Sequence, residues 1–114
     1  MLKPLHLSRT ELIAYVARQL ASFYPDGLDT DAPAVLAAHM DTALARLGRC
    51  INEVRFWVPD QFDHLHSTQY TLFLYYLSHT IWQATGNCTL CTKLFCLNKA
   101  LNGIDLFYEI EMPE

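Results

Sequence analysis

The four cysteines are the side chains of this sequence with the widest range of possible chemistry, and two of them form a Cys-x-x-Cys motif. Cys88 and Cys91 have the spacing of a zinc-ligand pair and also that of a thioredoxin-like dithiol. No second ligand pair occurs at matching spacing, and Cys96 would lie about 140° further round a helix than Cys91. The βαβ context that a redox dithiol needs is also missing. We therefore interpret Cys91 and Cys96 as small buried hydrophobic residues and Cys88 as a partly exposed one, and we predict no metal and no cofactor.

Two histidines and two aspartates form the next group with chemical potential. His64 and His66 lie close to Asp60 and Asp63, and together these side chains could make half of a metal site or an acid–base site. The same residue types also form turns and cap helices when they precede a helix. We favour this second interpretation and assign no catalytic residue to the group.

A further histidine, His79, lies within a mostly apolar segment. Such a histidine is expected to be satisfied by a helix carbonyl or a neighbouring side chain. If the helices enclose an apolar ligand pocket, Tyr75, Tyr76 and His79 are its candidate polar groups. The sequence has no glycine-rich phosphate loop and no G-x-S-x-G nucleophile motif.

Composition limits the class of protein that these residues can belong to. The chain has 114 residues, 52% hydrophobic and 18% charged, which suits one domain with its own core. The net charge is -4 and the basic residues are scattered, so the sequence shows no clustered basic patch that would bind nucleic acid. The longest apolar run, 70–81, is interrupted by Ser78 and His79 and is too short to span a membrane. The first residues make a poor secretory signal, so we expect a cytoplasmic protein with reduced cysteines.

Hydrophobic periodicity predicts an all-α fold, a compact bundle of four main helices. Ser8 and Glu11 fit a capping box at the start of the first helix, and Pro59 is expected to follow the end of the second. Gly86 suits a left-handed helix C-cap and Asn87 an N-cap, which predicts an antiparallel C-terminal helix pair. The expected helices cover residues 9–24, 31–57, 67–85 and 88–108.

The end of the fourth helix is ambiguous in the sequence. Asn102-Gly103 fits the usual stop signal. The apolar interval nevertheless continues from Leu97 through Leu101 to Tyr108 without a change of phase. We therefore predict that the helix passes Gly103.

Two runs of sequence carry a family resemblance. The first is HSTQY at 66–70 with FLY at 73–75, and the second is LNKAL at 97–101 with IDLFYEIEMP at 104–113. With these runs the chain resembles the helical N-terminal region of serine acetyltransferase-like proteins, in the hexapeptide-repeat acyltransferase superfamily. The resemblance covers about half of the chain.

The resemblance implies a non-catalytic helical domain that assembles subunits and supports a left-handed parallel β-helix. In the family, the β-helix follows the proline, binds acetyl-CoA and supplies a histidine as general base. Full-length relatives would therefore be O-acetyltransferases. None of these residues maps onto this sequence, so we expect no acetyltransferase activity from the isolated chain. It would serve a β-helix domain in cis or in trans; the alternative is a free-standing small-molecule-binding or adaptor protein.

The predicted end of the fourth helix also suggests an assembly surface. Left bare, its apolar side chains would form a patch of the kind that monomeric proteins rarely expose. We therefore expect a homo-oligomer, with the contact at Ile104, Phe107, Tyr108, Ile110 and Met112. The alternative is that this segment folds back onto the chain's own helix at 67–85 and covers the patch.

Overall fold

The computed structural model describes residues 2–103 and 106–110, with the side chain of Cys88 left out. The all-α prediction is confirmed, because four helices account for most of the described residues. Two very short strands accompany them. In chain order the elements are β1 (Lys3–Pro4), α1 (Arg9–Phe23), α2 (Ala32–Glu53), β2 (Gln61–Phe62), α3 (Ser67–Thr85) and α4 (Cys88–Asn102). None of the helices in the described part of the chain has the length and hydrophobicity needed to cross a bilayer.

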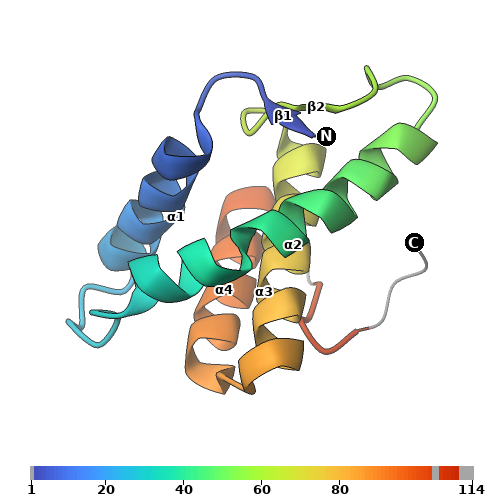
Figure 1. Ribbon diagram of the computed structural model, residues 1–114. Coiled ribbons are helices and arrows are strands. Elements are labelled where there is room, and N and C mark those ends of the chain that lie inside the picture. The colour runs from blue at the N-terminus through green and yellow to red at the C-terminus, as the bar shows by residue number, and fades with distance from the viewer. Residues whose placement is uncertain (1, 104–105, 111–114) are drawn as a thin grey trace.

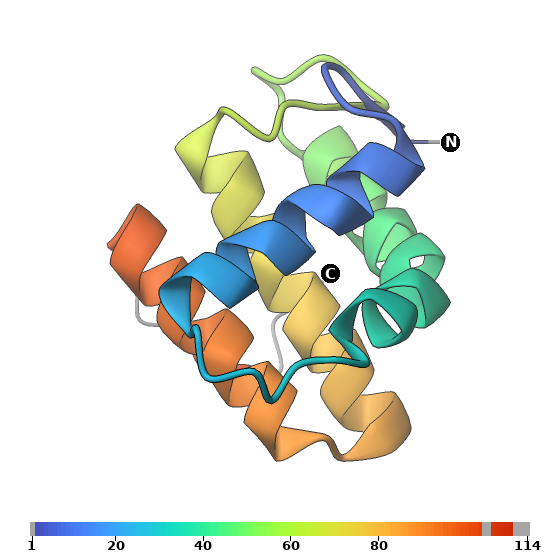
Figure 2. The ribbon, with the colours of Figure 1, turned by 90° about the vertical axis from the view of Figure 1, so that its left-hand side faces the viewer.

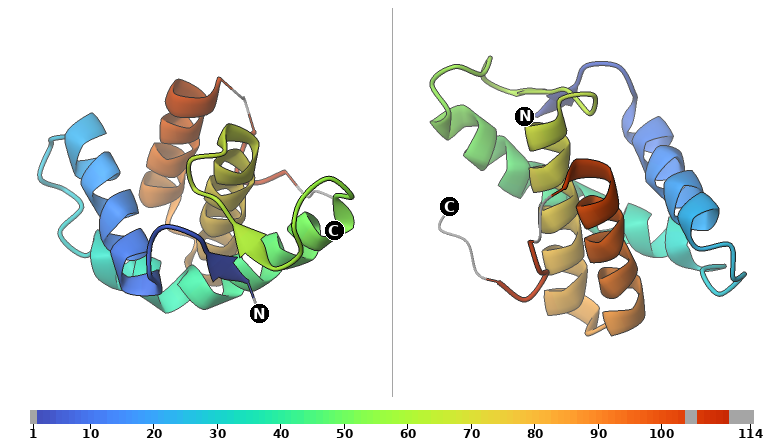
Figure 3. Two further views of the ribbon diagram at one scale, coloured as in Figure 1. Left: turned by 90° about the horizontal axis from the view of Figure 1, so that it is seen from above. Right: turned by 180° about the vertical axis from the view of Figure 1, so that it is seen from behind.

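The helix α3 lies at the centre of the bundle, packed against both α2 and α4 (Figure 1). Its partner α4 runs beside it in the opposite direction after the tight connection at Gly86 and Asn87. The helix α1 packs on α2 and α4 and covers the face of the bundle that is turned toward the viewer in Figure 2. The long helix α2 passes obliquely behind this group when the molecule is seen from behind (Figure 3).

The capping residues place most helix ends where the sequence predicts them. Ser8 and Glu11 exchange hydrogen bonds of 3.1 and 2.9 Å in a capping box at α1. Gly86 adopts a left-handed conformation with φ 68°, and the Asn87 side chain accepts the Leu90 amide at 3.1 Å. The cap of α3 is His66: its Nδ1 accepts the amide of Gln69 at 3.3 Å.

Two features between α2 and α3 were not predicted from the sequence. The helix α2 ends at Glu53 instead of near residue 57, and the chain continues in an extended conformation at Val54. The strand β1 then pairs in parallel with β2, with Lys3 opposite Gln61. Such two-residue strands carry no recognisable sequence periodicity, since the alternation that marks a strand needs several residues.

The prediction that the fourth helix passes Gly103 is wrong. The helix α4 ends at Asn102, and Gly103 takes the left-handed conformation with φ 69°, its amide bonded to the Lys99 carbonyl at 3.0 Å. Leu101, which the apolar interval assigned to a buried face, is half exposed. Glycine adopts a positive φ without steric strain because it has no Cβ atom. The helix therefore ends at this glycine, although the apolar interval continues beyond it.

The C-terminal segment, defined as the described residues 106–110, instead folds back beside α3 and α4 (Figure 3). Tyr108 is only 5% exposed and joins the hydrophobic core. Its ring packs near that of the partly buried Trp82, and its hydroxyl lies 3.3 Å from the Thr92 hydroxyl. Ile104 and Met112 lie outside the described residues.

We predict that Tyr108→Ala lowers the free energy of unfolding by about 3 kcal/mol, because it removes a buried aromatic side chain. Urea unfolding followed by circular dichroism measures this change. Leu101→Ala, at a half-exposed site on α4, is the matched control and should be nearly neutral. Equal stability of the two variants would contradict the packing of the C-terminal segment.

Candidate functional site

The three candidate pocket residues are buried together in a polar cluster. Tyr75, Tyr76 and His79 on α3 are at most 1% exposed, and none of them lines either groove described below. Arg46 of α2 reaches this cluster, with Nη1 at 2.9 Å from His79 Nδ1 and its guanidinium 5.0 Å from the centre of the Tyr76 ring. Because a guanidinium can only donate, His79 Nδ1 must accept, so the imidazole is neutral with its proton on Nε2.

This cluster also holds the C-terminal segment. The Tyr75 hydroxyl donates a hydrogen bond to the main-chain carbonyl of Ile110. The Tyr75 ring stacks on His79, with centroids 5.4 Å apart. The buried polar side chains of α3 therefore connect α2 to the C-terminal segment.

The structure describes the side chains of Cys50, Cys91 and Cys96, and all three are free thiols. Cys91 is fully buried, and its thiol donates to the Ser78 carbonyl at 3.2 Å, as expected for a small core residue. Cys96 is only partly buried, which differs from the prediction. Burial, with help from Cys96, raises the pKa of the Tyr24 hydroxyl to about 12. Within residues 2–103 and 106–110, no three side chains of histidine, cysteine, aspartate or glutamate meet in a way that could hold a metal ion.

The loop before α3 separates the four residues that the sequence grouped together. His66 caps α3, and Asp60 is held by Asn52 on α2 through a hydrogen bond of 3.0 Å. Asp63 lies 3.4 Å from Nε2 of His6, a residue that no local sequence pattern places here. The strand β1 brings His6 to this loop, and such long-range pairing leaves no local sequence signal.

His64 occupies the centre of the remaining ring cluster. Its imidazole makes edge contacts with Tyr15 at 4.9 Å and His6 at 5.7 Å between centroids. Burial against these rings lowers the pKa of His64, the nearby His6 lowers it further, and Asp63 partly offsets the effect. Protonation is therefore disfavoured in the folded state.

A second ionic cluster ties the α1–α2 connection to α4. The Lys93 ammonium is almost buried and lies 2.8 Å from Asp26 and 2.7 Å from Asp29. Hydrogen bonds to these carboxylates raise the pKa of Lys93, and the ammonium in turn lowers the pKa of Asp26. A small groove of about 300 Å³ lies beside this cluster, between Tyr24 and Thr30. Because both carboxylates are already bonded to one lysine, we interpret the cluster as a structural contact that holds the α1–α2 connection against α4.

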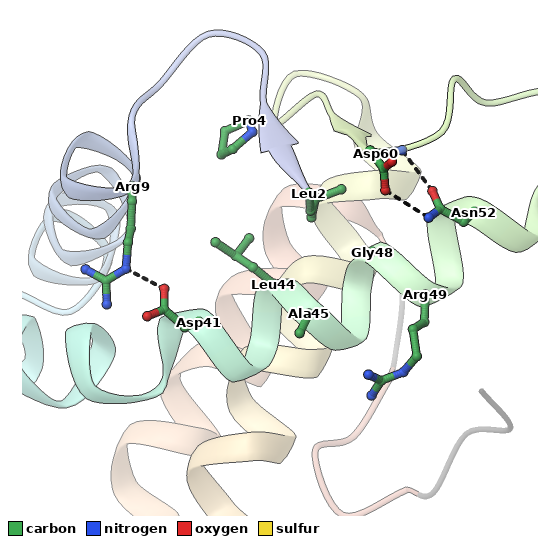
Figure 4. Close-up of a pocket in the computed structure, with 10 residues that line it drawn as sticks. All are labelled: Leu2, Pro4, Arg9, Asp41, Leu44, Ala45, Gly48, Arg49, Asn52 and Asp60. Carbon is green, nitrogen blue, oxygen red and sulfur yellow. Dashed lines mark hydrogen bonds and ion pairs between the residues drawn. The ribbon is translucent and has the colours of Figure 1, made fainter.

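A larger concavity, the α2 groove, is shown in Figure 4 with the residues that line it. It has a volume of about 460 Å³ and is mainly apolar. Small residues of α2, Ala45 and Gly48, form its floor, and the N-terminal residues Leu2 and Pro4 form one wall. A Cβ atom at Gly48 would lie 3.4 Å from Leu2, so the glycine leaves room for this N-terminal residue. The groove could not be predicted from the sequence, because its two walls are distant in the chain.

Comparison with known protein families, curated proteins and solved structures finds no match for this chain. The fold and the side-chain clusters define it as an all-helical bundle with a polar cluster inside its hydrophobic core and an apolar surface groove. The resemblance to the serine acetyltransferase N-terminal region stays a prediction.

We predict that His64 contributes to the pH dependence of stability. Because its pKa is lower in the folded state, the unfolded chain takes up the proton more readily, and the free energy of unfolding falls as the pH drops below the ordinary histidine value of about 6.5. His64→Gln should reduce this fall, measured by urea unfolding between about pH 8 and pH 5. His39→Gln on α2 is the control, and an equal effect of both changes would contradict the prediction.

Proposed function

We propose that this chain is a non-catalytic helical assembly module that supports an acyltransferase β-helix domain, in the same chain or in another one. The resemblance of 66–75 and 97–113 to serine acetyltransferase N-terminal regions suggests the class of partner. The observation that carries the proposal is the anchoring of the C-terminal segment. In the resembling family, the chain passes from this position into the β-helix.

Three contacts give the C-terminal segment a defined position on the bundle. Tyr108 is buried between α3 and α4, Phe107 packs edge-on against Phe95 at 5.2 Å, and the Ile110 carbonyl accepts from Tyr75. Ile110 itself is 45% exposed. The bundle therefore supports the segment rigidly on one side while an apolar side chain is presented on the other, which suits a structural support for a second domain.

Two finer points belong to the same proposal. We infer that the module self-associates, since apolar side chains such as Phe56 and Ile110 remain exposed on the protomer. We also infer that it acts in the cytoplasm, where its cysteines stay reduced; Cys50, Cys91 and Cys96 are free thiols in the structure.

The support of a β-helix domain can be tested with a fusion protein. We expect that joining this chain to the β-helix domain of a serine acetyltransferase raises the melting temperature of that domain, because the C-terminal segment restricts its motion. Ile110→Glu should remove much of the gain, whereas Leu101→Glu, equally exposed but on α4, should not. Differential scanning calorimetry on the three fusions and the isolated domain measures this. A β-helix domain that gains no stability from the fusion would rule out the proposal.

A separate prediction concerns catalysis. The isolated chain should not transfer an acetyl group from acetyl-CoA to serine, because no residue of the resembling family's acetyl-CoA site or general base maps onto it. Release of free coenzyme A, followed by a thiol reagent with the chain and serine present, measures the reaction. Turnover above the rate of the buffer control would show that the chain is an enzyme.

A further inference from the structure

The loop between α2 and β2 displays a nearly fully exposed aromatic side chain. Phe56 is 95% exposed and Val58 is 57% exposed. We call residues 53–59 the Phe56 loop. A phenylalanine so far from any contact within its own protomer contributes nothing to the fold, because it removes almost no apolar area from water.

The Phe56 loop is nevertheless well braced. Asn52 and Asp60 close its neck with two hydrogen bonds: the Asn52 amide donates to the Asp60 carboxylate at 3.0 Å, and the Asp60 main-chain amide donates to Asn52 at 2.8 Å (Figure 4). Inside the loop, the amide of Trp57 bonds to the Val54 carbonyl at 3.2 Å. The Trp57 ring turns inward and packs edge-on to His66 at 5.4 Å. Phe56 is thus held outward by a defined loop, which lowers the entropy lost when it binds a partner.

The neck of this loop is also the rim of the α2 groove. Asn52 and Asp60 both line the groove, whose apolar floor includes Leu44 and Ala45 (Figure 4). The protomer therefore carries a projecting aromatic side chain and an apolar groove next to each other. The groove is mainly apolar, which suits an aromatic side chain better than a polar ligand.

We propose that the Phe56 loop of one protomer docks into the α2 groove of a second copy of this chain, and the reverse, in a two-fold dimer. The two surfaces are neighbours, so a two-fold axis passing between them brings each loop to the other protomer's groove. Both contacts form together and leave no free loop to recruit a third chain. Phe56 is the central anchor, as large aromatic side chains are at interfaces. This inference rests on the proposed function, because it names the contact through which the assembly module self-associates.

Charges at the two surfaces permit this contact. The groove is lined by two basic and two acidic residues: Arg9, Arg49, Asp41 and Asp60. The loop itself carries one charge of each sign, Glu53 and Arg55. The net charge of -4 on the chain is therefore not concentrated where two identical copies would meet, and like-charge repulsion does not oppose the docking.

Analytical ultracentrifugation at micromolar concentration tests the dimer. We expect a wild-type dimer and monomeric Phe56→Ser and Ala45→Glu variants, since the first removes the anchor and the second places a charge on the groove floor. Both side chains are exposed in the protomer, so circular dichroism should show unchanged helix content. Phe23→Ser, at an exposed phenylalanine at the end of α1, is the matched control and should remain dimeric.

A mixing experiment separates reciprocal docking from general stickiness. Phe56→Ser retains an intact groove and Ala45→Glu retains an intact loop. A mixture of the two should form a heterodimer through one loop–groove contact, although each variant alone is monomeric. No association in the mixture would overturn the inference.

The remaining outcomes distinguish this inference from the proposed function. A dimer that survives Phe56→Ser overturns the loop–groove contact but leaves self-association through another surface, such as that of Ile110, which Ile110→Glu would then disrupt. A dimer lost in Phe56→Ser but kept in Ala45→Glu shows that the loop docks outside the α2 groove and also overturns the inference. A small molecule found in the groove of the purified protein also overturns the loop–groove contact. A monomeric wild type removes both the dimer and the self-association part of the proposed function. Support of a β-helix domain would still be decided by the fusion experiment.

Discussion

The burial of α3 on nearly all sides is the constraint on which the rest of the structure depends. Its residues from Gln69 to Ile81 are buried with the exception of Leu72, so α2 and α4 must cover opposite sides of one helix. A helix without an exposed polar face can exist in water only as the centre of a bundle. The remaining uncovered side is closed by the C-terminal segment, with Tyr108 in the core. The short connection at Gly86 and the fold-back after Gly103 both follow from this need to cover α3.

Polar side chains of α3 make this burial specific. His79, Tyr75 and Thr80 would each oppose burial if they had no partner, since a lost hydrogen bond in the interior is costly. Arg46 donates hydrogen bonds of 2.9 and 3.0 Å to His79 and Thr80, and the Tyr75 hydroxyl donates one to the Ile110 carbonyl. These directional bonds set the position of α2 and of the C-terminal segment on α3 more narrowly than apolar packing alone. The polar cluster around His79 therefore helps to set the arrangement of the helices.

The interior cluster on α3 is polar, whereas two features of the surface, the Phe56 loop and the α2 groove, are mainly apolar. The Phe56 loop and the α2 groove meet at the Asn52–Asp60 hydrogen bonds, so one pair of side chains both braces the projection and borders the concavity. The exposed C-terminal Ile110 lies on a different part of the chain, after α4. Two separate apolar surfaces on a small bundle are the features on which the proposed self-association and the proposed contact with a second domain both depend.

The sequence by itself determined the all-α class, the capping at Ser8 and Asn87 and the turn at Gly86, because these depend on residues within one or two helical turns of each other. It also gave the correct stop signal at Gly103, but the apolar interval beyond it argued for a longer helix, and only tertiary packing shows that Tyr108 reaches the core from a folded-back segment. The β1–β2 pair, the partnership of Arg46 with His79 and the α2 groove were decided by the tertiary structure alone. Each joins residues far apart in the chain, and the single-sequence pattern carries no information about which distant side chains meet.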